Sequence, residues 1–341
     1  MLDTSKLKAF LSQKRTVFIT THLRPDGDAI GSILALYHFL KYSGHNVIAV
    51  IPSEYPYYFE WFPGIKELLN YQNNKELVLQ ELAKSEIIFA VDFNQLKRNG
   101  ELGQKLAETT LPKVLIDHHT LPDDIFDYKF SDTTASASAE LVFEIIRQLE
   151  PDLLNNKDIT TCLYSGIVTD CGMFKYPSTT SRTHAIASRL VESGIDIGLI
   201  NSLLFDNFTE KRLRYWGHCL SEKLHINEEL HLSVLTVSKH ELTGNHLKTS
   251  DLEGLAGFPL ILDNVYLSAL FIEREKYVKV SFRSKFDFPT NLFARKYFNG
   301  GGHLNASGGE ITLTLDESVA YFMEKIGEFE VYLRSKKHNL I

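Results

Sequence analysis

The sequence predicts an α/β protein with a mostly parallel sheet and flanking helices in its N-terminal half, followed by a smaller C-terminal α+β domain. In the first half, runs rich in β-branched residues alternate with segments of helical apolar spacing, which is the pattern of βαβ units. After about residue 190 the β-rich runs follow one another more closely. The chain has 341 residues, and one core rarely exceeds roughly 250–300 residues, so two domains are expected.

The N-terminal half is expected to contain four buried strands and three helices. The strands are assigned to the apolar, β-branched runs at residues 15–21, 46–51, 86–92 and 113–117. The helices are assigned to segments with apolar residues at helical spacing, at residues 29–42, 136–149 and 158–169. In parallel sheets ligands bind at the carboxyl ends of the strands, so the polar residues that follow these strands form the candidate site.

The C-terminal part is expected to begin with a connecting helix at residues 201–224. Strands are then assigned to 230–238, 264–273 and 277–284, and helices to 289–298 and 317–335. The resulting domain prediction has a catalytic domain at 1–195, a helical linker at 196–227 and a substrate-binding domain at 228–341.

The composition and net charge of the chain limit the kinds of molecule that it is expected to bind. The chain carries 43 acidic and 36 basic residues and a net charge of -7, which argues against coating long nucleic acid but permits a short nucleotide in a local pocket. Its three cysteines form no CxxC motif and leave one unpaired in any disulfide scheme, which favours a reducing compartment. Neither a signal-peptide core nor an apolar run of ~18 residues is present, so a cytoplasmic protein without a membrane partner is expected.

The strongest local feature is the segment THLRPDGD at residues 21–28, which leaves the first predicted strand and enters a helix. His22, Asp26 and Asp28 lie on this short loop. Carboxylate oxygens bind hard divalent cations, and imidazole suits Mn, Fe, Co and Zn, so the three side chains are candidate metal ligands. The alternative is that Asp28 caps the helix and Asp26 makes the turn, which is the favoured interpretation of this loop taken alone.

Further candidate ligands follow the other predicted elements. Asp92 ends the run EIIFAV, Asp117, His118 and His119 end KVLI, and Asp170 ends the helical run CLYSGIVT. Adjacent side chains on an extended segment point to opposite faces, so one histidine can bind a metal while its neighbour faces the substrate. The alternatives are a turn or cap for Asp92, a solvated loop for the histidines and a surface helix end for Asp170.

A glycine-rich motif lies far downstream. Three glycines, Gly300, Gly301 and Gly302, precede His303 and allow the backbone to approach an anion and present N–H groups to it. Arg283, near the end of a predicted strand, can bind a phosphate through its forked guanidinium. The alternatives are a flexible turn and a solvent-exposed strand arginine.

As an ordered set, these motifs resemble the DHH phosphoesterase superfamily over about residues 15–315. The matching segments are HLRPDGD at 22–28, VD at 91–92, DHH at 117–119 and GIVTD at 166–170. FRSK at 282–285 and GGGHLNASGG at 300–309 resemble the DHH-associated domain. The nearest subgroup is the bacterial oligoribonuclease and 3′-phosphoadenosine 5′-phosphate (pAp) phosphatase. That subgroup often has proline after the GGGH histidine, where this chain has Leu304 and Asn305.

The resemblance implies a site with two divalent cations, usually Mn²⁺, with Mg²⁺ or Co²⁺ as alternatives. It assigns one cation to His22, Asp26 and Asp92. It assigns the other to Asp28, Asp92, His118 and Asp170, so that Asp92 is shared. It also implies that His119 faces the scissile phosphate, that Arg98 supports the catalytic site and that Asp117 orients a ligand histidine. The terminal phosphate or nucleotide is assigned to Arg283, Gly300, Gly301, Gly302 and His303.

The implied reaction is hydrolysis of short oligoribonucleotides, pAp or both, by attack of a metal-bound hydroxide. The alternatives are a linear or cyclic dinucleotide phosphodiesterase, a pyrophosphatase or exopolyphosphatase, and an inactive nucleotide-binding protein. All matching ligand positions are filled, which argues against the inactive form. Relatives dimerise through the N-terminal domain, so a homodimer is an alternative to a monomer.

Overall fold

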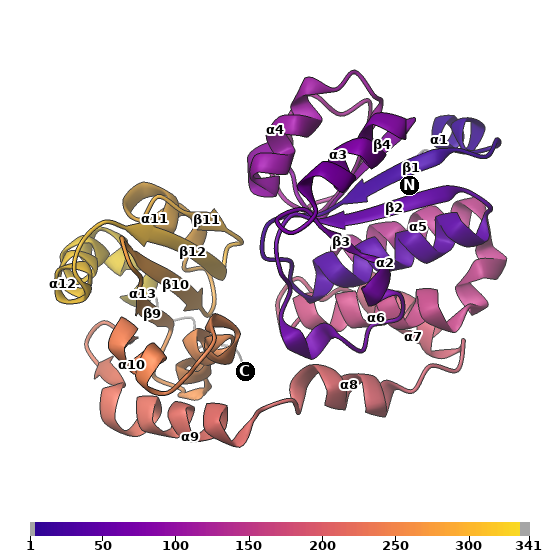
Figure 1. The fold of residues 1–341 in the computed structure, drawn as a ribbon. Coiled ribbons are helices and arrows are strands. Elements are labelled where there is room, and N and C mark those ends of the chain that lie inside the picture. Colours follow the sequence, from indigo (N-terminus) through magenta and orange to yellow (C-terminus); the bar gives the residue numbers. More distant parts are fainter. Residues whose placement is uncertain (1–3, 335–341) are drawn as a thin grey trace. The chain divides into compact units, whose positions relative to one another are not determined.

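A six-stranded sheet in the order β3-β2-β1-β4-β5-β6 forms the centre of the N-terminal part, and every neighbouring pair is parallel (Figure 1). Its strands are β1 (Thr16–Thr20), β2 (Asn46–Ile51), β3 (Leu69–Asn70), β4 (Ile87–Val91), β5 (Lys113–Asp117) and β6 (Tyr128–Ser131). β4 and β5 are buried along their whole length, which explains their continuous apolar runs. The predicted parallel α/β architecture is confirmed in this computed structural model, which describes residues 4–334.

Helices cover both faces of this sheet. The helices of the N-terminal part are α1 (Ser5–Phe10), α2 (Gly27–Tyr42), α3 (Lys75–Lys84), α4 (Glu101–Glu108), α5 (Ser138–Leu149), α6 (Lys157–Asp170), α7 (Ser181–Val191) and α8 (Ile197–Phe205). Buried residues of α2, α5 and α6 share one hydrophobic core with alternate residues of the strands. α3 and α4 pack on the opposite face against the remaining strand residues.

Helix α2 begins at Gly27, two residues earlier than predicted, because Asp26 caps it. The Asp26 Oδ1 atom accepts a hydrogen bond from the Ala29 N–H at 3.0 Å. α2 also packs closely on α6, since a Cβ at Gly31 would lie 2.5 Å from the carbonyl oxygen of Cys162. These contacts fix the loop that carries His22 and Asp26 against the core.

The chain divides into two compact units, Met1–Asn207 and Phe208–Ile341. The second unit contains a sheet in the order β11-β12-β10-β9-β8-β7, in which β8 and β9 are parallel and the other pairs are antiparallel. Its strands are β7 (His225–Asn227), β8 (Leu232–Val237), β9 (Leu267–Glu273), β10 (Val278–Ser284), β11 (Gly301–Gly302) and β12 (Ala306–Ile311). Its α-helices are α9 (Glu210–His218), α10 (Lys239–Gly244), α11 (Thr290–Tyr297), α12 (Leu315–Lys325) and α13 (Glu330–Arg334).

The prediction of one connecting helix over residues 201–224 is wrong. α8 ends at Phe205, α9 begins at Glu210, and a π-helical turn follows at Cys219–Lys223. The break has a local cause, because the Asn207 side chain donates to the carbonyl of Leu204 at 2.6 Å and so ends α8. Thr209 then caps α9 by accepting from the Arg212 N–H at 3.1 Å.

The prediction of a continuous helix over residues 317–335 is also wrong. Two α-helices, α12 and α13, are separated there by a 3₁₀ turn at Ile326–Phe329, and residue 335 lies outside the described residues. Within residues 4–334, no helix has both the length and the apolar character needed to cross a bilayer.

Candidate metal centre

The candidate ligands come together at the carboxyl edge of the N-terminal sheet. β1 leads into the loop with His22 and Asp26, β4 ends directly before Asp92, and β5 ends before His118. Because these three strands are adjacent and parallel, their carboxyl ends meet at one edge. Asp170 is the last residue of α6, and its side chain reaches the same edge.

Asp92 lies at the centre of the group. Its Oδ2 atom is 3.3 Å from His22 Nε2, and its Oδ1 atom is 3.7 Å from His118 Nε2. The residue is buried and has a left-handed backbone, with φ of 63°. Aspartate tolerates this conformation better than most residues, and such local strain is common at functional sites. One carboxylate therefore faces two histidines that come from different strands.

Two sets of candidate metal ligands share the Asp92 carboxylate. The set with His22 and Asp26 is called the first donor group, and the set with Asp28 and His118 the second. Ligand atoms of His22, Asp26 and Asp92 lie within 4.8 Å of one another, and so do those of Asp28, Asp92 and His118. Asp170 Oδ2 is 3.4 Å from His118 Nε2, which joins it to the second group. Oxygen and imidazole donors without thiolate suit divalent ions such as Mn²⁺ better than soft metals.

The two histidines are oriented by backbone carbonyls. His22 Nδ1 is 2.9 Å from the carbonyl oxygen of Leu23, and His118 Nδ1 is 3.2 Å from that of Ala135. In each ring the Nδ1 proton is thereby used, which leaves Nε2 as the metal-binding atom. His22 Nε2 is buried and lies 3.3 Å from Asp92 Oδ2 and 3.9 Å from Asp26 Oδ2, which suits it to bind a cation together with these carboxylates.

The segment after β6 supports the second donor group. The Ser138 and Ala139 N–H groups donate to Asp28 at 2.6 and 3.0 Å, and the Ser138 hydroxyl donates to Asp92 Oδ1 at 2.8 Å. Ser32 also donates to Asp28 at 3.0 Å. Ser138 could not be identified from the sequence, because a serine at the start of an apolar helical run only indicates a helix start.

The electrostatics of the group favour a cation. Burial, together with the charges of Asp92 and Asp170, raises the pKa of Asp28 well above its ordinary value. Burial also raises the pKa of Asp170 to about 7, and the nearby Asp26 and Asp92 charges act in the same direction while His118 opposes them. Crowded carboxylates hold their charge poorly without a partner, and a divalent cation supplies that partner.

The histidines compensate part of this charge at Asp92. Burial alone would raise the pKa of the Asp92 carboxyl, but the neighbouring His22, His119 and His118 hold it well below its usual range. For His22, burial alone would lower the pKa, but the carboxylates of Asp92 and Asp26 outweigh it and raise the value. His118 behaves in the same way, with Asp170 and Asp92 outweighing burial.

His119 has a different partner from His118. Its Nδ1 atom is 2.7 Å from Asp117 Oδ1, and its backbone N–H donates to Asp117 Oδ2 at 3.0 Å. Asp117 is fully buried and thus fixes the ring of His119, while Ala135 fixes His118. Arg98 lies in the 3₁₀ turn Leu96–Asn99, and its charge acts to lower the pKa of His22.

The candidate substrate-binding residues lie in the second unit. Arg283 is on β10, and its Nη1 atom donates to the Phe282 carbonyl at 2.9 Å. A Cβ at Gly300 would lie 2.0 Å from the Gly308 oxygen, and one at Gly302 would lie 2.5 Å from the Ala306 oxygen. Strand packing therefore explains these two glycines, whereas a Cβ at Gly301 would meet nothing within 4 Å.

Some backbone N–H groups of the glycine motif form hydrogen bonds within the second unit. The Gly300 N–H donates to the Ala294 carbonyl at 3.2 Å, and the His303 N–H donates to the Ala306 carbonyl at 2.8 Å. These two N–H groups are therefore used within the second unit.

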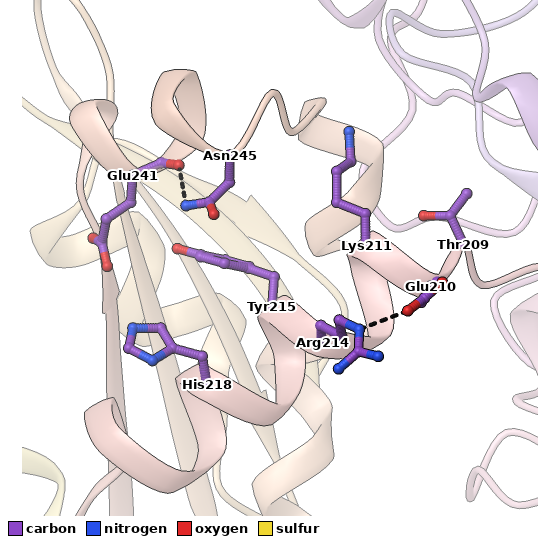
Figure 2. Close-up of a pocket in the computed structure, with 8 residues that line it drawn as sticks. All are labelled: Thr209, Glu210, Lys211, Arg214, Tyr215, His218, Glu241 and Asn245. Carbon is purple, nitrogen blue, oxygen red and sulfur yellow. Dashed lines mark hydrogen bonds and ion pairs between the residues drawn. The ribbon is translucent and has the colours of Figure 1, made fainter.

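A separate pocket of about 820 Å³ opens on the second unit (Figure 2). It is lined by Thr209, Glu210, Lys211, Arg214, Tyr215, His218, Glu241 and Asn245. Glu210 accepts a bond from Arg214 at 2.7 Å, and Glu241 accepts one from Lys223 at 2.5 Å. Its carboxylates are thus paired within the chain, and it contains none of the residues predicted for the site.

A parallel α/β sheet with this buried His/Asp cluster at its carboxyl edge is a candidate centre for divalent metal ions. The sequence profile described as "DHH family, N-terminal domain" matches residues 16–167. The chain belongs to the DHH family.

Similar proteins cover nearly the whole chain. A crystal structure of an exopolyphosphatase-related protein from Bacteroides fragilis is 34% identical, covers 96% of each chain and superposes with a TM-score of 0.91. The bifunctional oligoribonuclease and PAP phosphatase NrnA of Bacillus subtilis is 28% identical over 87% of this chain and 89% of its own. The cyclic-di-AMP phosphodiesterase PdeA of Listeria monocytogenes is 25% identical over 89% of this chain but only 46% of its own.

Replacing Gly166 of α6 with alanine tests how tightly Asp28 is held. The new Cβ would lie 2.9 Å from the Ala139 Cβ and 3.0 Å from Asp28 Oδ1, so Ala139 must shift and Asp28 must move slightly. We expect Gly166→Ala to destabilise the chain by about 1–3 kcal/mol in urea unfolding and to weaken Mn²⁺ binding. The matched control is Gly198→Ala on α8, where the new Cβ would make only ordinary contact at 3.5 Å. Equal behaviour of the two variants would contradict the packing argument.

Proposed function

We propose that this protein is a two-cation phosphoesterase that hydrolyses short oligoribonucleotides and pAp. The observation that carries the proposal is the position of Asp92, whose two carboxylate oxygens face His22 on one side and His118 on the other. A carboxylate shared in this way is the arrangement that a pair of neighbouring cations requires. The similarity to the B. subtilis oligoribonuclease and PAP phosphatase supports the choice of substrate.

The proposed ligands form two sets. His22, Asp26 and Asp92 would hold one cation, and Asp28, Asp92, His118 and Asp170 would hold the other. Mn²⁺ fits the mixed oxygen and imidazole donors, with Mg²⁺ or Co²⁺ as substitutes. When bound, the pair would lower the pKa of a water molecule and offset negative charge on the phosphoryl oxygens.

His119 is proposed to act on the substrate. Because Asp117 accepts from its Nδ1 atom, the Nε2 atom is the one through which the ring can hold or deliver a proton. The buried Asp117 fixes the orientation of the ring, so His119 is proposed to stabilise a phosphoryl oxygen or to protonate the leaving oxygen through Nε2. Arg98 would add positive charge beside the first donor group.

Substrate recognition is proposed for the second unit. Arg283 and His303 would contact the terminal phosphate or nucleotide, and the open position at Gly301 would let the substrate approach the backbone. The net charge of -7 gives long nucleic acid no general attraction, which agrees with a preference for short substrates.

A substrate panel with added Mn²⁺ tests the proposal. We expect turnover of pAp and of RNA two to five nucleotides long, and much slower turnover of long RNA and pyrophosphate. Linear pApA and cyclic di-AMP belong in the panel, because the similarity to the Listeria phosphodiesterase favours dinucleotide hydrolysis as a second candidate. Rapid release of phosphate from pyrophosphate, with no action on pAp or short RNA, would contradict the proposal.

A further inference from the structure

Residues 132–140 comprise the link from β6 to α5 and the first turn of α5, and they contact several proposed ligands of the second cation. The Ala135 carbonyl lies 3.2 Å from His118 Nδ1. The Ser138 N–H donates to Asp28 at 2.6 Å, and the Ser138 hydroxyl donates to Asp92 at 2.8 Å. The geometry of the second donor group therefore depends on where this segment lies.

Arg182, on the first turn of α7, holds both ends of that segment. Its Nη1 atom is 2.8 Å from Asp132 Oδ2 at the start, and its Nε atom is 3.5 Å from Glu140 Oε2 at the end. The Ser136 hydroxyl donates to the other oxygen of Glu140 at 2.6 Å. The clamp, meaning Arg182 with Asp132 and Glu140, thus surrounds the residues that contact the ligands.

The Oε2 atom of Glu140 is buried and has no hydrogen-bond partner among the described residues, so the ion pair with Arg182 is its charge compensation. The Glu140 side chain is fully buried, while that of Arg182 is 34% exposed. A buried carboxylate needs a positive partner, and removing that partner leaves an uncompensated charge that pushes the local structure to rearrange. Loss of Arg182 is therefore expected to move Glu140, and with it the segment that holds Ala135 and Ser138.

The first donor group depends less on this segment, because Ser138 contacts Asp92 through Oδ1, the oxygen that faces His118, while Oδ2 faces His22. His22 Nδ1 is bonded to the Leu23 carbonyl, and Asp26 is bonded to the Ala29 N–H within the loop before α2. Neither contact involves residues 132–140. A change at the clamp should thus weaken the second cation site much more than the first, which it reaches only through Asp92.

We propose that Arg182 and Glu140 are positioning residues that set the affinity of the second cation through segment 132–140. This inference rests on the proposed two-cation function. It assigns a role in metal binding to an arginine whose ion pairs are with Asp132 and Glu140, neither of which is a proposed ligand.

Titration of the metal-free, full-length chain with Mn²⁺ tests it, with calorimetry for affinities and electron paramagnetic resonance for coupling between the two ions. We expect Arg182→Gln to weaken the second binding event by about 10–100-fold, the usual effect of losing a group that orients a ligand. The affinity of the first event should change much less, and the coupled signal should appear only at higher Mn²⁺. Raising Mn²⁺ should also restore kcat with little change in KM.

Arg189→Gln is the matched control. Arg189 is on the same helix and has the same 34% side-chain exposure, but it faces Asn155 and Glu192 instead of the clamp. It should bind both cations like the wild type. Arg182→Lys should recover part of the second affinity, because one ammonium cannot reach both carboxylates as the guanidinium does.

Glu140→Gln provides a second route if Arg182→Gln folds poorly. It keeps the shape and the Ser136 contact but removes the charge, so it should weaken the same binding event. If the wild type binds two ions and neither variant loses affinity for the second ion selectively, the proposed role of the clamp is wrong. A wild-type chain that binds fewer than two ions would instead overturn the proposed function.

Discussion

Asp92→Asn is expected to lower kcat on pAp or short RNA by on the order of 10³–10⁵-fold, the scale seen when one member of a catalytic unit is lost. The reason is that Asp92 offers one oxygen to each donor group, so a neutral amide weakens both cation sites at once. The measurement is steady-state kinetics with Mn²⁺ varied from micromolar to millimolar, which separates weaker metal binding from slower chemistry.

At position 92, replacement by asparagine isolates the loss of the carboxylate better than replacement by alanine. The backbone of Asp92 has φ of 63°, which asparagine adopts readily, whereas alanine would add backbone strain to the loss of the ligand. Asp124→Asn is the control, because Asp124 is fully exposed and only pairs with Lys129 on the surface. If Asp92→Asn kept more than a tenth of wild-type kcat at saturating Mn²⁺, a shared carboxylate would not be the basis of catalysis.

Removal of divalent metal is expected to abolish activity and to lower the melting temperature of the protein. The buried Asp28 and Asp170 have raised pKa values in the metal-free chain, mainly through burial and also through neighbouring carboxylates, so an added cation relieves an unfavourable arrangement. A ligand at ~1,000 times its Kd stabilises the folded state by about 4 kcal/mol, so Mn²⁺ should raise the melting temperature by roughly 10 °C.

Differential scanning calorimetry of the chelated protein, with and without Mn²⁺, measures this shift. An equal concentration of KCl controls for ionic strength and should leave the melting temperature nearly unchanged. Asp170→Asn should reduce the Mn²⁺-dependent rise, because it removes a proposed ligand of the second cation. A protein that is fully active after exhaustive chelation, with no response to Mn²⁺, would contradict this prediction.

The sheet edge could be predicted from sequence because its signals are local. The runs 15–21, 86–92 and 113–117 are rich in apolar and β-branched residues, and a candidate ligand lies at or just after the end of each. Parallel strands bring their carboxyl ends together, so Asp92 and His118 were expected to meet. Strand order and the mixed pairing of the second sheet depend on tertiary contacts and were not predicted.

The contacts that hold the candidate ligands in place could not be predicted from the sequence. Ser138 acts partly through its backbone N–H, and Ala135 acts through its carbonyl, so neither role has a side-chain signature. Arg182 and Glu140 are 42 residues apart, and only the packing of α7 beside α5 brings them together. β6, with the sequence YKFS, is a short edge strand whose composition carries little strand signal.

The most direct test of the central claim is a crystal structure of the protein grown with Mn²⁺, with anomalous scattering measured to locate the metal. The account predicts two Mn²⁺ ions about 3.5–4 Å apart, each bound by one oxygen of Asp92, with His22 on one ion and His118 on the other. A single ion, or two ions that do not share Asp92, would contradict it.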